Sequence, residues 1–294
     1  MNSLKRLAQR GREFVFNGLG GIQHSDPVPQ LNLLLAYQAL KESGAALPQL
    51  HQVGFKAFSQ TDEDGILLYI FSIIGSASKR TVEFCAGNGV ECNSANLIIN
   101  HGWHGLLVDG DDQLVKSGVD FYNRNPHTYV YPPVFVHSWI TRNNVNSLIT
   151  EHGFMGDIDL LSIDMDGVDY WIWNAIDCIE PRVVVVEYQD ILGPDRSCSV
   201  PYSDSFNSSD YSSSRGMPNF AGASLLAFVN LARSRGYRLV GCNRYGYNAF
   251  FIRNPLGEKE LPEIDINQCF IHPKVLWGMK ERYPLVKDLP WVNV

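Results

Sequence analysis

Residues 81–109 decide the fold, and they read TVEFCAGNGVECNSANLIINHGWHGLLVD. A short apolar run leads into a turn with glycines at positions 87 and 89, and a helical stretch then ends at Gly102. A second apolar run ends at Asp109. A glycine turn between a buried strand and a helix lets the backbone approach a ligand closely. The segment therefore predicts a strand, turn, helix and strand at the start of a parallel sheet.

The same alternation continues along the chain. Strands are predicted at 81–85, 105–109, 128–136, 158–164 and 182–188, and helices at 91–102, 111–122, 141–153 and 170–179. Continuous apolar strands between helices are typical of a parallel sheet buried on both faces. Pro132 and Pro133 imply a bend or an edge position for the third strand. Residues 237–242 and 248–253 predict a terminal antiparallel hairpin, so we expect an α/β fold with helices on both faces.

Three parts are predicted along the 294 residues: an N-terminal helical extension (1–54), one α/β domain (55–255) and a C-terminal tail (256–294). The domain carries an insertion at 197–220 that is rich in Ser, Asp and Tyr, and loops of this length usually cover a site. The tail is expected to pack on the domain or on another subunit, which leaves a homo-oligomer open.

Composition excludes several classes of protein. The formal net charge of −7 argues against general binding to nucleic acid, which needs a cationic surface. Six scattered cysteines are expected to be reduced thiols. The longest apolar run, at 66–74, is far shorter than the roughly 20 residues of a membrane span, and no signal peptide is visible. We therefore expect a cytoplasmic protein.

The first group of candidate binding residues surrounds the glycine turn. Gly87 and Gly89 would let a ligand approach the backbone, although a plain tight turn has the same pattern. Glu83 lies in the strand just before them, where a carboxylate can bind an ammonium group. A carboxylate in an apolar strand is costly to bury, so Glu83 is expected to have a cationic or donor partner.

Asp109 ends the next strand and is followed by Gly110. In nucleotide-binding α/β folds, an acidic residue at this place accepts hydrogen bonds from ribose hydroxyls. A dinucleotide site also wants a small residue three positions after the second glycine, but Cys92 stands there with Glu91 beside it. Because that carboxylate would repel a pyrophosphate, a nicotinamide dinucleotide is disfavoured.

A third group is acidic. Asp164 and Asp166 follow one predicted strand, and Glu187 ends the next, so their side chains should meet at the carboxyl edge of the sheet. Clustered carboxylates raise one another's pKa or hold a divalent cation, and either arrangement can deprotonate a substrate hydroxyl. Alternatively, Asp166 belongs to a plain turn, and Asp169 caps the following helix.

The string IDMDGV at 163–168 also looks like the nucleophile motif of haloacid dehalogenase-type phosphatases, which depend on magnesium. In that family the acidic metal motif follows the nucleophile in the chain. Here the only GDD, at 110–112, precedes it, so the phosphatase hypothesis ranks last.

Two further segments flank the predicted pocket. The string SQTDEDG at 59–65 places Asp62 or Asp64 to cap the next helix, and it lets Gln60 fold over a bound cofactor. Ser138 and Trp139 end the third strand, where adenine would lie, and Trp139 is as well suited to a structural role as to stacking on adenine.

The segments 59–65, 82–98, 106–112, 158–171 and 183–188 together resemble the FkbM-type methyltransferases, over roughly residues 55–255. The resemblance implies a Rossmann-like class I methyltransferase fold with S-adenosylmethionine as the methyl donor. Members of the family mostly O-methylate sugars, polyketides and other natural products.

On this resemblance, Glu83 meets the methionine ammonium, Asp109 meets the ribose, and Asp164 is a base or a metal ligand. A weaker similarity to TylF-type sugar O-methyltransferases implies that Asp164, Asp166 and Glu187 hold Mg²⁺. Those enzymes have a second acidic residue where this chain has Tyr188.

The sequence thus predicts an S-adenosylmethionine-dependent methyltransferase that O-methylates a hydroxylated small molecule or a sugar. Tyr188 and Tyr202, the latter in the Ser- and Tyr-rich insertion, are predicted to contact this acceptor. The alternative from another class is a methyltransferase-like protein that binds or assembles without turnover.

Overall fold

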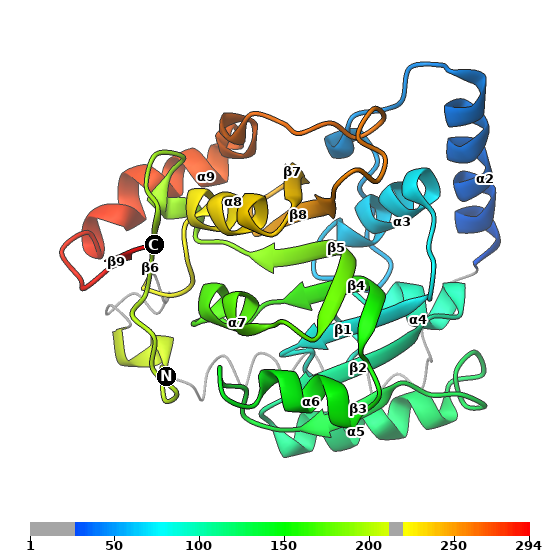
Figure 1. Ribbon diagram of the computed structural model, residues 1–294, viewed down its shortest axis with the longest axis horizontal. Coiled ribbons are helices and arrows are strands. Elements are labelled where there is room, and N and C mark those ends of the chain that lie inside the picture. The colour runs from blue at the N-terminus through cyan, green and yellow to red at the C-terminus, as the bar shows by residue number, and fades with distance from the viewer. Residues whose placement is uncertain (1–26, 212–219) are drawn as a thin grey trace.

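The computed structural model describes residues 27–211 and 220–294. Residues 1–26 of the predicted helical extension and 212–219 of the predicted insertion lie outside this range. The centre is a seven-stranded sheet in the order β3-β2-β1-β4-β5-β8-β7 (Figure 1). Its strands are β1 (Arg80–Phe84), β2 (His104–Asp109), β3 (Val134–His137), β4 (Gly156–Ile163), β5 (Ile179–Glu187), β7 (Tyr237–Cys242) and β8 (Asn248–Arg253).

Strands β1 to β5 are parallel, and β8 is antiparallel to both β5 and β7. The predicted fold class, a mainly parallel Rossmann-like sheet with a terminal antiparallel hairpin, is therefore confirmed. The helices are α2 (Val28–Ser43), α3 (Glu63–Ile74), α4 (Ala95–His101), α5 (Asp112–Arg124), α6 (Val145–Glu151), α7 (Asp169–Ala175), α8 (Leu225–Ser234) and α9 (Pro273–Trp277).

Two apolar cores form because the sheet is covered on both faces. One core joins the sheet to α6, α7, α8 and the tail, and the other joins it to α3, α4 and α5, with α2 packed on α3. In β5, Val184 and Val186 enter the first core, while Val183 and Val185 enter the second. All four are fully buried, and each such side chain contributes on the order of 1.5 kcal/mol or more.

The third strand is shorter than the sequence predicts. Of residues 128–136, only the last three belong to β3, and the chain before Pro133 forms turns. Because proline has no N–H group to donate, it ends the pairing at this point. The predicted edge position is confirmed, since β3 is the outermost strand on its side.

The tail packs on the domain. Val275 and Val286 are buried in the first core, and the ring of Trp291 lies 4.6 Å from that of Phe220. Strand β9 (Val292–Asn293) pairs with β6 (Cys198–Ser199) at the base of the insertion. Within the described residues, no helix combines the length and apolarity that crossing a bilayer would require.

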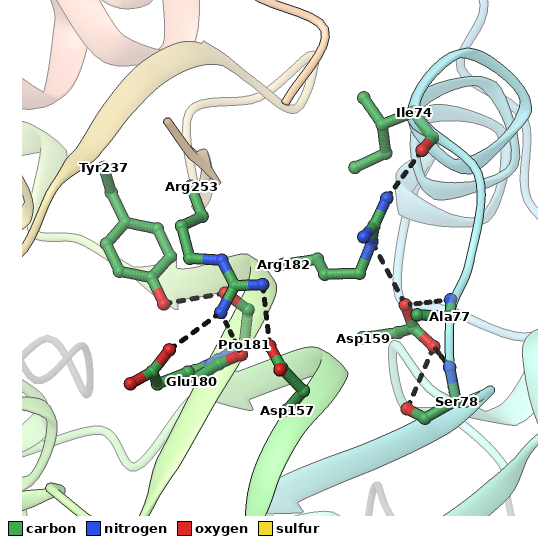
Figure 2. Close-up of polar contacts among 10 residues, drawn as sticks. All are labelled: Ile74, Ala77, Ser78, Asp157, Asp159, Glu180, Pro181, Arg182, Tyr237 and Arg253. Carbon is green, nitrogen blue, oxygen red and sulfur yellow. Dashed lines mark hydrogen bonds and ion pairs between the residues drawn. The ribbon is translucent and has the colours of Figure 1, made fainter. Parts of the chain in front are cut away.

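The amino edge of the sheet is fixed by two arginine-carboxylate groups (Figure 2). Asp159 of β4 is fully buried and accepts hydrogen bonds from the backbone N–H groups of residues 77–79. Arg182 of β5 pairs with it at 3.3 Å. Arg253 forms the second group with Asp157, at 2.8 Å, and with Glu180 at 3.2 Å. Of the two groups, only the one around Asp159 is buried. Asp157, in the other group, has a side chain that is 68% exposed.

Replacing Asp159 with Ala should therefore destabilise the protein by about 3 kcal/mol, since it leaves the Arg182 charge and three N–H groups without their partner. The matched variant Asp157→Ala, on the same strand and also paired with an arginine, should cost less than about 1 kcal/mol. Urea unfolding monitored by circular dichroism measures both values. Equal losses in the two variants would contradict the assigned difference in burial.

Candidate functional site

The glycine turn combines an open position with a crowded one. A Cβ atom on Gly87, whose φ is +59°, would have no heavy atom within 4 Å. A Cβ on Gly89 would lie 2.8 Å from atoms of Leu107 and Phe135. Gly87 therefore leaves room for a ligand above the turn, whereas Gly89 is required for packing. Cys85 just before them also has a positive φ, +59°, which is uncommon for a residue with a side chain.

Glu83 organises the start of α4. Its two carboxylate oxygens accept hydrogen bonds from the backbone N–H groups of Asn93 (2.9 Å) and Ser94 (2.7 Å). The predicted need for donor partners is thus confirmed. These bonds hold residues 91–94 in a turn, so α4 begins at Ala95 and not at residue 91 as predicted. Binding of an ammonium group by Glu83 stays a prediction.

Asp109 links the ends of β2 and β1. Its Oδ2 accepts from the N–H group of Gly87 at 2.7 Å, and its Oδ1 accepts from that of Asp111 at 2.8 Å. Partial burial raises the pKa of Asp109. Each carboxylate oxygen keeps a second lone pair, so the residue still has acceptors for two hydroxyl groups. This geometry fits the predicted contact with a ribose.

Trp139 lies beside this carboxylate. The Ser138 N–H group donates to the Asp109 carbonyl at 3.0 Å, which brings the end of β3 next to the end of β2. A Cβ on Gly110 would lie 3.2 Å from the indole of Trp139, so the ring packs against that glycine. The indole is 60% exposed, and its Nε1 donates to the Asp204 carbonyl at 2.6 Å.

Gln60 is exposed on a segment next to the glycine turn. Its carbonyl accepts from Lys56 Nζ at 3.0 Å, and the same Nζ pairs with Glu91 at 3.2 Å. The structure therefore places residues 59–65 beside the predicted cofactor pocket. Contact between Gln60 and a cofactor stays a prediction.

The predicted helix cap in that segment is wrong. Asp62 precedes α3 but makes no capping hydrogen bond to it. Asp64 accepts from the N–H groups of Ala57, Phe58 and Ser59, so it fixes the preceding loop. Burial raises the pKa of Asp64 to about 6, and hydrogen bonds from these N–H groups oppose the rise.

Asp164 and Glu187 form a hydrogen-bonded pair of carboxyl groups at the carboxyl ends of β4 and β5. Burial, together with the charges of Asp166 and Asp169, raises the pKa of Asp164 to about 8. Burial and the neighbouring Asp164 raise the pKa of Glu187 well above its usual value. Once Asp164 has lost its proton, above about pH 8, we assign the remaining proton of the pair to Glu187, which donates it to the Asp164 carboxylate.

Asp166 and Asp169 belong to the turn that follows β4. Asp166 is exposed and has a positive φ of +52°. Asp169 is fully buried and accepts from the N–H groups of Met165 (2.7 Å) and Gly167 (3.1 Å). It therefore closes the turn, and the predicted capping of α7 is wrong because no side chain caps that helix. Burial raises the pKa of Asp169 to about 6.

The acidic residues do not form a metal centre in this structure. Among residues 27–211 and 220–294, no three His, Cys, Asp or Glu side chains are grouped to hold a metal ion. These residues therefore do not fit the implied Mg²⁺ as they stand.

The two tyrosines predicted to contact the acceptor differ in position. Tyr188 is 3% exposed, and its hydroxyl donates to the carbonyl of Cys269 in the tail at 3.3 Å. Tyr188 thus packs against the tail, and its contact with the acceptor stays a prediction. Tyr202 lies in the insertion, where its hydroxyl accepts from the Arg142 N–H group at 2.8 Å and donates to the Asp204 carboxylate.

The described part of the insertion crosses the carboxyl edge and packs on the acidic turn. A Cβ on Gly167 would lie 2.9 Å from the ring of Phe206, so this ring rests on the turn that holds Asp166. Phe206 also stacks with Tyr211 at 5.9 Å. Phe206 is not among the residues predicted from the sequence. Its only signal was an aromatic residue in an otherwise polar stretch.

Comparisons with known proteins give fold-level likenesses. No family model matches the chain, and no curated protein matches it in sequence. Among solved structures, the chain is similar to the CcbJ methyltransferase from Streptomyces caelestis (14% identity, 70% of this chain and 96% of that one, TM-score 0.41). It is also similar to an O-methyltransferase from Bacillus cereus with S-adenosylhomocysteine (13% identity, 79% and 91%, TM-score 0.41).

A third similar structure is the magnesium protoporphyrin IX methyltransferase from Synechocystis PCC 6803 with bound S-adenosylmethionine (10% identity, 65% and 78%, TM-score 0.39). At TM-scores near 0.4 these are loose backbone likenesses. The fold assignment rests on the strand order and directions described above.

The raised pKa of Asp164 predicts a pH-dependent stability. The folded protein keeps this proton to about pH 8, whereas the unfolded chain loses it near 3.8. Unfolding therefore releases a proton in this window, and the free energy of unfolding falls as pH rises through it. Asp164→Asn removes this loss, so the variant should melt at least about 2 °C above the wild type at pH 8, and the gain should vanish near pH 4.

Thermal melts across pH 4 to 8 measure this difference. Asp112→Asn, at an exposed position on α5, is the control and should show no such gain. A melting difference for Asp164→Asn that does not change with pH would show that the carboxyl titrates normally.

Proposed function

We propose that this protein is an S-adenosylmethionine-dependent methyltransferase that O-methylates a hydroxylated small molecule or a sugar. One observation carries the proposal. At the carboxyl edge of the sheet, the open glycine turn after β1 is bonded to Asp109 at the end of β2, and Asp164 and Glu187 pair at the ends of the neighbouring strands β4 and β5.

The donor half of the site consists of the first two strand ends. Asp109 has acceptors for both ribose hydroxyls, Gly87 leaves space above the turn, and Ser138 and Trp139 border the same place. Gln60 and Glu83 complete the predicted donor contacts. S-Adenosylmethionine, when bound, supplies an electrophilic methyl group on a sulfonium.

Asp164 is the proposed general base. A base works best when its pKa lies near the working pH, and that of Asp164 is about 8. Glu187 keeps the remaining proton and orients the Asp164 carboxylate by donating to it. Asp164 then takes the proton of the acceptor hydroxyl as the oxygen attacks. Asp166, on the exposed turn after β4, lies next to the position proposed for the acceptor hydroxyl.

The acceptor lies, in this proposal, beneath the described part of the insertion. Phe206 and Tyr202 bring aromatic surface and a hydroxyl group close to the acidic turn, and such surfaces suit sugars and other polyhydroxylated molecules. Because no three potential metal ligands are grouped among the described residues, the proposed reaction has no step through Mg²⁺. Positioning the acceptor oxygen in line with the methyl group supplies most of the acceleration.

Isothermal titration calorimetry with S-adenosylmethionine tests the donor site. Asp109→Ala should weaken binding about tenfold or more, because two hydrogen bonds to a carboxylate are lost. Asp112→Ala, three residues away on the exposed side of α5, should change the affinity less than about twofold. Lack of binding by the wild type would remove the basis of the proposal.

Formation of S-adenosylhomocysteine, screened over sugars and other hydroxylated acceptors, tests the base. Asp164→Asn should lower kcat about 100-fold or more, because general base catalysis is lost. Glu187→Gln keeps an N–H donor toward Asp164 and should lose far less. The wild-type rate should rise with pH toward about 8, and the variant Asp164→Asn should lack this rise.

Addition of EDTA should leave that rate unchanged. Full activity in Asp164→Asn would refute its role as base, while cofactor binding without turnover on any acceptor would favour the binding or assembly alternative.

A further inference from the structure

A second candidate site lies at the opposite, amino edge of the sheet. A cavity of about 520 Å³ opens there between the loop at 76–80, the start of β2 and Tyr131. Its size falls within the range of about 300–1,000 Å³ typical of small-molecule sites. The parallel strands β1, β2 and β4 separate it from the glycine turn and the carboxyl pair, which lie at their other ends.

The cavity is cationic although the chain as a whole has a formal net charge of −7. Lys79 Nζ bonds to the carbonyl of His101 at 3.1 Å, and the Arg80 guanidinium bonds to the carbonyl of Gly153. Within the described residues neither cation has a carboxylate partner. Carbonyl dipoles compensate a full charge only in part, so both cations remain able to bind an anion.

A buried carboxylate fixes the loop that forms the cavity wall. Asp159, fully buried, holds the N–H groups of Ala77, Ser78 and Lys79 and the Ser78 hydroxyl (Figure 2). Arg182 also pairs with Asp159, at 3.3 Å, so the charge of this carboxylate is already balanced inside the fold (Figure 2). Lys79 has a φ of +52°, an uncommon conformation that this network maintains.

An imidazole with an unused nitrogen completes the wall. His104 is stacked on Tyr131 at 4.2 Å and on Phe154 at 5.5 Å, and Arg80 lies over the same Phe154 ring. Its Nδ1 is buried and has no hydrogen-bond partner among the described atoms, which is costly for a polar group. Both His104 and Tyr131 line the cavity, and Tyr131 is 69% exposed at its outer side.

We propose that this amino-edge cavity binds the phosphate group of a small phosphorylated ligand. Four donor groups line it: the Lys79 ammonium, the Arg80 guanidinium, the Ser76 hydroxyl and an imidazole nitrogen of His104. A phosphate offers enough oxygen acceptors on different sides to use them together, whereas a carboxylate offers only two oxygens in one plane. The inference does not depend on the proposed methyltransferase activity.

Inorganic phosphate and ribose 5-phosphate, titrated into the full chain at low ionic strength, test the proposal. Saturable binding at millimolar concentrations or below is expected, together with a shift of the His104 ring signals in the NMR spectrum. Lys79→Met should weaken binding about tenfold, and the double variant Lys79→Met, Arg80→Met should abolish it. Lys116→Met, which removes a 74% exposed lysine from α5, should bind like the wild type.

Tighter binding of ribose 5-phosphate than of inorganic phosphate would identify a phosphorylated metabolite as the ligand, and equal binding would identify the phosphate ion itself. Lys79→Met keeps the test decisive if the double variant does not fold, because its side chain is exposed. The proposal is overturned if neither probe saturates, or if Lys79→Met and Lys116→Met bind equally well.

Discussion

The constraint on which this structure depends is the burial of its parallel sheet on both faces. Apolar side chains fill the strands, so every polar group inside them needs a fixed partner. Glu83 finds it in the N–H groups of residues 93 and 94, and Asp159 in the loop at 77–79 and in Arg182. These two carboxylates shape the turns at opposite edges of the sheet, and those turns form the two sites described above.

The contrast between the two edges comes from how the acids are partnered. At the amino edge, Asp159 is fully matched by donors and an arginine. At the carboxyl edge, Asp164 and Glu187 interact mainly with each other, so the pKa of each carboxyl group is raised. The same residue type thus has a structural role where cations and N–H groups surround it, and a raised pKa where they are missing.

Much of the fold could be predicted because apolar runs indicate buried strands and glycines indicate turns and helix ends. The sheet, the hairpin and the meeting of Asp164 with Glu187 follow from strand ends. The burial of Tyr188 and its bond to the Cys269 carbonyl could not be predicted, because the tail residue that accepts this bond is far away in the sequence. The partners of Glu83 and the left-handed backbone at Cys85 leave no local signal, because they arise from contacts made only in the folded chain.

The bond between Trp139 and the carbonyl of Asp204 has a practical consequence. It ties an exposed indole to the insertion, and Trp171 lies against Tyr202 of the same segment. Any movement of this segment would change the surroundings of both indoles at once. The protein therefore carries an intrinsic fluorescent reporter between the proposed donor and acceptor positions, and stopped-flow emission could follow the insertion without an added label.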